Sequence, residues 1–465
     1  MTSSTPIGNG QSRHNGSLKD AFALTLGRGR VASLEKDISL WNLDGEGWAN
    51  WKRHLAQRDK PTPLAGLAAS SRQSPLSWGV SDDLFADSAV GELIRKKHPV
   101  RDGGPIDWAG ELQQWQSGAA DATVDATFAL SALAWAHALP ALAKIAPANQ
   151  WCYAVPVLLA LAEEAAQTAG DGAPLPHQIL AGELPLTLAY LLPEIDVCRQ
   201  SAAAGRIALS EGLLAMCDGE GLPHGCCLHV ADRLLATWTR SLLMGRQMKK
   251  GKGEFTEAAL VQYEWLVRQM MRLRRPDGRA MLAADAAPWR PDLFKTALDL
   301  VGDREDRAIA KATLPGWKGE AKKHGRRLPA PAINSEWAKL ALLRADWKNG
   351  SPRLLINYDA RRVQTELVVD KTVVWSGDCT PQVSLAGKPL ALSSDWEELC
   401  WDCDKDGDYV EIQAALQSGW KLQRQFYLAR DDQFLLIADA ILGPDAGEVG
   451  YRCRWPLAQG VKFRS

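Results

Sequence analysis

The sequence predicts two domains in series, an α-helical domain followed by a domain of antiparallel β-sheets. Three observations lead to this prediction. Between residues 106 and 274, apolar residues recur with helical period in segments rich in Ala and Leu. From residue 354 onward the pattern changes to short segments of period two, which is typical of strands. A Pro-containing stretch at 326–334 separates the two patterns and is typical of a linker.

Length and composition limit the class of protein. A chain of 465 residues is too long for one small core, which favours two domains. The formal net charge of −1 gives no overall basic field, so we expect no nucleic-acid partner. No run approaches the roughly 18 consecutive apolar residues of a membrane span. The nine Cys are scattered and no signal-peptide core is evident, so we expect reduced thiols and a cytoplasmic protein.

The helical domain is predicted to span 38–325, after an N-terminal arm at 1–37 that is rich in Ser, Gly and Asn and is expected to be disordered. Residues 38–58 are predicted to form short helices, and the Pro- and Ser-rich segment 59–79 a loop. The segments with helical periodicity are 108–116, 123–145, 151–169, 177–192, 197–217, 224–248 and 256–274. Turn signals between them predict a run of antiparallel helical hairpins.

The sheet domain is predicted to span 335–465 and to open with a short helix that has Ser335 as its N-cap. The predicted strands are 354–358, 365–369, 373–375, 409–416, 420–428, 434–440 and 449–455. These strands predict a β-sandwich. Because they are fewer than a large sandwich uses, we expect the sandwich to be incomplete and the chain to be truncated.

Titratable residues and glycines gather at one predicted helix entrance, in the stretch 218–233. An acidic, glycine-broken turn is followed by His224 and His229. Arg233 and Arg240 follow His229 at offsets of four and eleven residues, which is one helix face. This face could present an imidazole and two guanidiniums to an anionic ligand, or it could be the solvated side of an ordinary amphipathic helix.

Several short motifs are similar to those of one known family. Pro176-His177, followed by Leu192-Pro193-Glu194, resembles an Asn-His segment and a Phe-Pro-Glu segment of that family. Leu228-His229 resembles its Tyr-His pair, and residues 336–347 and 411–439 resemble its entry into the sheet domain and its sandwich strands. The family is that of the heparinase II/III-like polysaccharide lyases. The resemblance implies an incomplete (α/α) toroid whose groove, closed by the sandwich, cleaves uronate-containing polysaccharide by β-elimination.

That chemistry needs a group that neutralises the uronate carboxylate, a base for the C5 proton and an acid for the leaving oxygen. The resemblance implies an Asn for the first role, which matches Pro176 here, and a Tyr for the others, which matches Leu228. The family's sandwich histidine should fall near 359–362, yet the last histidine is His324. The chain is therefore expected to be a divergent member with a rearranged site.

Four residues are candidates for a rearranged catalytic site: His177, Glu220, His224 and His229. At a helix start, His177 could equally be a capping or packing residue. Three further residues are candidate substrate contacts: Arg233, Arg240 and Tyr263. Tyr263 shares the helical spacing of the apolar residues around it, which also fits a core position.

No cofactor or metal site is expected. Cys400 and Cys403 form a lone CxxC without a second pair, and the alternating acids at 402–408 lack the spacing of a helical calcium loop. Three classes of function remain. The first is a lyase acting on acidic polysaccharide or oligosaccharide, the second a catalytically inactive glycan-binding protein, and the third an interaction protein that uses the toroid as a docking surface.

Overall fold

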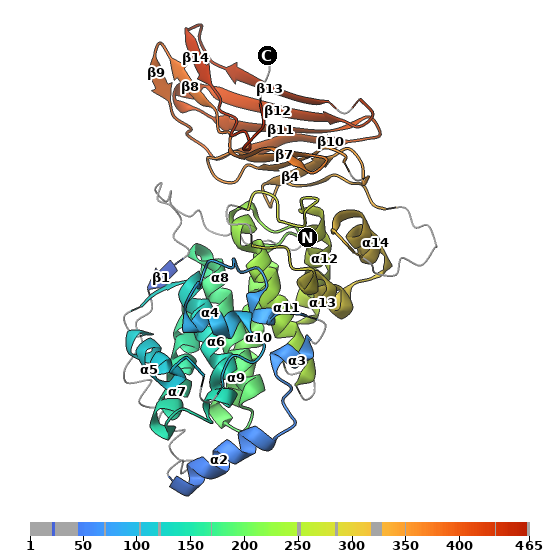
Figure 1. Ribbon diagram of the computed structural model, residues 1–465. Coiled ribbons are helices and arrows are strands. Elements are labelled where there is room, and N and C mark those ends of the chain that lie inside the picture. The colour runs from blue at the N-terminus through green and yellow to red at the C-terminus, as the bar shows by residue number, and fades with distance from the viewer. Residues whose placement is uncertain are drawn as a thin grey trace, which may run out of the picture.

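The computed structural model describes residues 21–23, 45–68, 71–101, 104–119, 122–168, 170–248, 253–283, 287–317, 328–348, 350–432 and 434–462. The helices form one body and the sheets form a second body stacked on one end of it (Figure 1). The predicted fold class, a helical array followed by an antiparallel β-sandwich, is confirmed.

The helical domain consists of a succession of helices joined by turns and longer loops. Its helices are α2 Gly45–Gln57, α3 Leu64–Leu67, α4 Ala89–Arg95, α5 Trp108–Ala119, α6 Ala126–Leu142, α7 Ala148–Ala166, α8 Pro174–His177, α9 Leu184–Leu191, α10 Asp196–Met216, α11 Ala231–Gln247, α12 Glu257–Arg272, α13 Pro291–Val301 and α14 Arg304–Thr313. Among the described residues of this domain, η1 Pro75–Ser77, η2 Gly170–Gly172 and η4 Gly225–Val230 have 3₁₀ geometry, and η3 Gln178–Glu183 is a π-helix.

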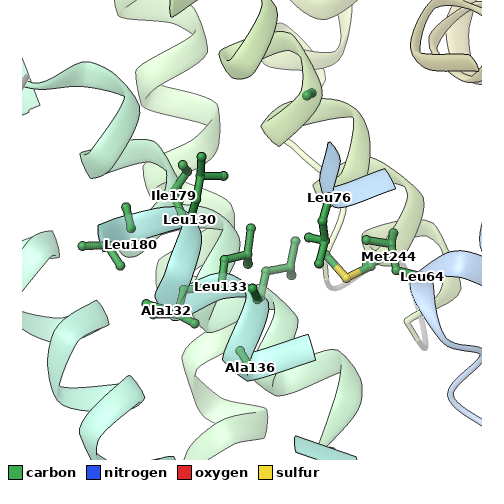
Figure 2. Packing of buried hydrophobic residues seen from close by; sticks show 14 of the residues in the cluster. Leu64, Leu76, Leu130, Ala132, Leu133, Ala136, Ile179, Leu180 and Met244 are labelled. Atoms are coloured by element: carbon green, nitrogen blue, oxygen red, sulfur yellow. The ribbon is translucent and has the colours of Figure 1, made fainter. Parts of the chain in front are cut away.

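The centre of the helical domain is built around α6, which has buried residues on all sides. Helices that are apolar all round lie inside a domain, because every face must be covered. Figure 2 shows how Leu130 and Leu133 of α6 pack in one core with Ile179 of η3 and Met244 of α11. The high Ala content lets these helices approach closely, and the long Leu and Met side chains fill the space that remains.

The helix prediction holds for the main segments and differs at their ends. The predicted helix 177–192 is divided into α8, the π-helix η3 and α9. The predicted helix 224–248 begins with η4, and α11 starts only at Ala231. Residues 21–23, within the arm expected to be disordered, form strand β1, which pairs with β2 Thr123–Asp125. The other residues of that arm lie outside the described residues.

The connection between the domains differs from the prediction. Residues 326 and 327 of the predicted linker lie outside the described residues, and its last two residues, 333 and 334, already belong to strand β3, Ile333–Ser335. The short helix expected after Ser335 is absent, and a turn followed by strand β4, Leu340–Arg344, occupies the segment. Ser335 does cap this turn, because its hydroxyl accepts a hydrogen bond of 3.1 Å from the N–H of Ala338.

The sheet domain consists of antiparallel sheets. Its further strands are β5 Arg353–Asn357, β6 Gln364–Val369, β7 Thr372–Asp378, β8 Gln382–Leu385, β9 Lys388–Leu390, β10 Glu397–Cys403, β11 Gly407–Ala415, β12 Lys421–Ala429, β13 Leu435–Leu442 and β14 Val449–Arg452. One sheet has the order β3-β4-β5-β6-β7, a second β10-β11-β12-β13 and a third β14-β8-β9. The sequence pattern missed β3, β4, β8, β9 and β10.

Strand β4 is buried on both faces and explains how the domains are joined. Ala341 and Leu343, which share one face of the strand, point into the core between the two larger sheets. Leu340 and Leu342 point the other way, into an apolar cluster that includes Leu228 of the helical domain. The sheet is thus covered by a second sheet on one side and by helical-domain loops on the other.

Two arginine side chains reinforce this junction, one half-buried and one buried. The guanidinium of Arg275 donates two hydrogen bonds of 2.6 and 2.5 Å to the carboxylate of Glu366, which has no exposed surface. Arg353 donates to the backbone carbonyl of Arg274 at 3.0 Å. Within the part of the chain that the structure describes, no helix is long and apolar enough to cross a membrane.

Candidate functional site

The loop before η4 is bent by Asp218. Its Oδ1 atom accepts hydrogen bonds from the backbone N–H groups of Glu220 at 2.9 Å and Leu222 at 2.8 Å. Gly221 has a φ of +79°, and a Cβ there would lie 2.3 Å from the backbone nitrogen of Leu266. Only glycine fits this conformation and this space. The acidic turn therefore fixes the direction of the loop that follows.

Gly225 docks that loop onto the sheet domain. Its N–H donates to the carbonyl of Ala338 at 2.7 Å, and its own carbonyl accepts from the side-chain amide of Asn357 at 3.3 Å. A Cβ on Gly225 would lie 2.3 Å from the Oδ1 atom of Asn357. The absence of a side chain therefore lets the two domains come into backbone contact at this point.

Side chains on both sides of this contact form a compact cluster. His224 is the N-cap of η4, and its Nδ1 atom lies 3.2 Å from the N–H of Cys226 and 3.1 Å from its Sγ atom. Asp359, in the loop after β5, joins them, so that one donor atom from each residue lies within 4.8 Å of the others. The Sγ atom of Cys227 lies 3.6 Å from that of Cys226. The cluster offers an imidazole, a thiol and a carboxylate that can transfer protons or hold a metal ion.

The residues of this cluster shift one another's pKa. The hydrogen bond from Cys227, together with His224, lowers the pKa of the Cys226 thiol to about 5. The hydrogen bond with Cys226 raises the pKa of His224 in turn. Burial raises the pKa of Asp359. These directions favour the thiolate of Cys226, because the hydrogen bond from Cys227 and the nearby imidazole stabilise its charge.

An aromatic ring and an ammonium group lie beside the cluster. The ring of Trp337 meets that of His224 edge-on at 5.2 Å, and Trp337 is 49% exposed. Lys339 interacts electrostatically with His224, and its Nζ atom lies 5.7 Å from the ring centre of Tyr358. An exposed indole can stack on a sugar face, and an ammonium can pair with a carboxylate.

The four predicted catalytic residues are not all in this cluster. His224 is part of it, and His229, exposed at the end of η4, interacts electrostatically with Cys226. The side chain of Glu220 is exposed, and its carbonyl accepts from Gln269. His177 ends α8, and its half-buried ring lies against Gly170. Among the predicted substrate contacts, Arg233 is half-buried in the first turn of α11.

The other two predicted substrate contacts lie in the helical core, which corrects the expectation that they face a groove. Arg240 is 1% exposed and donates to the carboxylate of Glu183 at 2.6 and 2.7 Å. Tyr263 has no exposed surface, and its hydroxyl lies 2.7 Å from that of Thr239. The single polar face predicted for His229, Arg233 and Arg240 does not form, because His229 precedes α11 and Arg240 points inward.

The positions that the resemblance matched to the family's neutralising asparagine and its proton-transfer tyrosine have structural roles here. Pro176 is buried in α8. Leu228 is 6% exposed and packs in the apolar cluster between the domains. Asp359, by contrast, lies in the stretch where the resemblance placed a histidine, and it belongs to the cluster at the junction.

An arginine-lined cavity lies on the sheet domain and was not predicted from the sequence. Its volume is about 550 Å³, and its walls include Arg361, Arg362, Arg452 and Arg454. Asp378 is the acid in the lining, and Arg361 lies 3.7 Å from Asp395. The adjacent arginines at 361–362, in the same loop as Asp359, and the alternate arginines at 452 and 454 were the available signals.

The comparisons with known proteins identify the fold. No family model matches the chain, and no curated protein matches it in sequence. Among solved structures, a heparinase III gene product with methylated lysines aligns with a TM-score of 0.59 at 9% identity, over 92% of this chain and 79% of that one. A crystal structure of heparinase III aligns with a TM-score of 0.55 at 12% identity, over 92% and 80% of the two chains.

A mutant of the heparan sulfate lyase HepC from Pedobacter heparinus aligns with a TM-score of 0.52 at 11% identity, over 93% of this chain and 80% of that one. At such low identity, a shared structure establishes the fold and leaves the activity open. The chain therefore has the fold of the heparinase III structures, a helical toroid followed by a β-sandwich.

Proposed function

We propose that this chain binds uronate-containing polysaccharide at the junction of its two domains and cleaves it by β-elimination. The observation that carries the proposal is the position of the His224 cluster, where helical-domain residues and the beginning of the sheet domain meet beside an exposed Trp337. The solved structures with this fold include lyases of acidic polysaccharide by name, which supports the same class of substrate.

The charges around the junction favour an acidic sugar chain. Lys339 is next to the cluster, and the arginine-lined cavity begins two residues after Asp359 in the same loop. Trp337 provides the apolar surface on which a pyranose ring can stack. A polymer with carboxylates along its length can contact both regions, whereas a neutral polymer gains nothing from the cations.

His229 is the residue that we assign to proton transfer. Neutral imidazole can take the C5 proton, and the electron pair of that C–H bond then forms the C4–C5 double bond. The C4–O bond breaks, its electrons remain on the leaving oxygen, and the imidazolium returns the proton to that oxygen. Leu228 occupies the position matched to the family's tyrosine, so the neighbouring histidine has to supply both steps.

A second function, binding without turnover, is favoured by a specific observation. Pro176 and Leu228 are buried apolar residues at the two positions where the resemblance implies polar catalytic groups. A protein of this fold that lost these groups and kept Trp337 and Lys339 would bind acidic glycans without cleaving them.

The test compares substitutions within the site with matched substitutions outside it. We expect His229→Gln to abolish formation of unsaturated uronide and His98→Gln, at another exposed histidine, to leave the rate unchanged. Trp337→Ala should weaken binding of an acidic oligosaccharide about tenfold, which is about 1.4 kcal/mol. Phe434→Ala, at an aromatic residue that is also 49% exposed, should not. Full activity in His229→Gln would contradict the assignment, and binding without turnover in the wild type would favour the second function.

A further inference from the structure

We propose that His224, Cys226 and Asp359 bind one transition-metal ion of the zinc type, with a fourth coordination position open to solvent. The three donors come from both domains. His224 and Cys226 belong to the start of η4 in the helical domain, and Asp359 belongs to the loop after β5 in the sheet domain. An ion at this place would join the helical domain to the sheet domain.

The separations of the donor atoms suit such an ion. Zinc binds sulfur at about 2.3 Å and nitrogen or oxygen at about 2.0–2.2 Å, so tetrahedral donors lie roughly 3.4–3.6 Å apart. The Nδ1–Sγ distance is 3.1 Å, and the donor atoms of the group lie within 4.8 Å of one another. Side-chain movements of about 1 Å or less therefore bring the donors to ligand positions.

The donor types select the metal. A cysteine sulfur and an imidazole are ligands of zinc and its neighbours, whereas magnesium and calcium take oxygen ligands. A second group of possible ligands, Glu264, Asp303 and Asp306, differs in this respect. Two of its carboxylates, those of Asp303 and Asp306, already pair with Arg268 at 3.6 and 2.6 Å.

The backbone around the donors is fixed from both domains. Gly225, which lies between His224 and Cys226, forms hydrogen bonds with the carbonyl of Ala338 and the side-chain amide of Asn357. The Oδ1 atom of Asn357 also accepts a hydrogen bond of 3.1 Å from the N–H of Asp359. The same asparagine thus holds the loop of one domain and the third ligand from the other, which is the arrangement that a preformed site requires.

Three protein ligands and one open position are typical of zinc sites that act on a substrate. The role that we assign to the open position, binding of the substrate, rests on the proposed function. The open position lies in the region of Trp337 and Lys339, where it can take a carboxylate oxygen of a bound uronate. The ion would then supply the neutralising charge that Pro176 cannot, with His224 as a ligand and His229 left for proton transfer.

The test uses the full chain, reduced and stripped of metal, and Co²⁺ as the probe. We expect one Co²⁺ per chain, with the visible bands of a tetrahedral ion and a near-ultraviolet thiolate-to-cobalt charge-transfer band. Zn²⁺ should displace the ion and abolish both signals. The charge-transfer band reports a sulfur ligand in the wild type and requires no variant.

Substitutions then identify the ligands. Cys226→Ser should remove the charge-transfer band, and both it and Asp359→Asn should weaken Co²⁺ binding at least about a hundredfold, the upper end of the loss for supporting contacts. Cys400→Ser, at another exposed cysteine, is the matched control and should leave the spectrum unchanged. Circular dichroism verifies that each variant is folded.

The absence of stoichiometric Co²⁺ binding by the reduced wild type would overturn the inference. So would a charge-transfer band that survives Cys226→Ser or disappears in Cys400→Ser. These outcomes do not depend on any glycan. A chain that forms unsaturated uronide without binding Co²⁺ would refute the metal site alone, and a chain that binds Co²⁺ without turnover would refute the lyase activity alone.

Discussion

Replacing Glu183 with Gln is expected to destabilise the helical domain severely. The side chains of Glu183 and Arg240 are 0% and 1% exposed and are joined by hydrogen bonds of 2.6 and 2.7 Å. The other acceptors of the guanidinium, the carbonyl of Pro75 and the hydroxyl of Thr237, carry no charge. Glu183→Gln therefore leaves a buried cation without a counter-charge, which costs about 3–5 kcal/mol of the free energy of unfolding.

Equilibrium unfolding in urea, followed by the helical circular dichroism signal, measures this loss. Asp196→Asn is the control, because Asp196 pairs with Arg199 at the surface and such a pair contributes at most about 1 kcal/mol. The double variant Glu183→Leu/Arg240→Met removes both charges and should be more stable than Glu183→Gln. A loss below about 1 kcal/mol in Glu183→Gln would refute the burial of this pair and restore Arg240 as a candidate ligand contact.

Three further predictions concern pH, the docking loop and the domain junction. Burial and Arg240 lower the pKa of His137 to about 3, so below pH 6.5 the unfolded chain binds a proton that the folded chain does not. The free energy of unfolding should fall by about 2 kcal/mol at pH 5 from this residue, and His137→Leu should flatten the dependence measured in urea. Gly225→Ala should cost about 1–3 kcal/mol in thermal denaturation, because its Cβ collides with Asn357, and an unchanged melting temperature would contradict the close docking. Glu366→Gln should weaken the domain junction by about 1–3 kcal/mol and separate the calorimetric transitions of the two domains, whereas a single unshifted transition would count against its role.

The order of the domains and most helices could be predicted because their signals are local. The apolar spacing of α10 indicates one buried face, and the turn residues between helices mark where the helices end. Strand β4 was missed for a physical reason. All five of its residues are buried, so the alternation that identifies a strand with one solvated face is absent, and its Leu and Ala residues also fit a helix, whereas the equally buried β5 includes the β-branched Ile356.

The candidate site was predicted only in part because its geometry depends on contacts between distant segments. The sequence singled out His224 and His229, but no local pattern links Cys226 with Asp359. Arg240 was placed on a polar face since arginines usually face solvent, and its partner Glu183 lies on another helical segment. A buried ion pair of this kind leaves no periodic signature.

Formation of unsaturated uronide by the wild-type chain is the measurement that tests the central claim most directly. The chain should be incubated with heparan sulfate, hyaluronan, chondroitin sulfate, alginate and ulvan while the ultraviolet absorbance of the C4–C5 double bond is followed. We predict a rise in absorbance with at least one of these polymers and no rise with His229→Gln. If the wild-type chain gives no rise in absorbance with any of these polymers, elimination at the domain junction is contradicted.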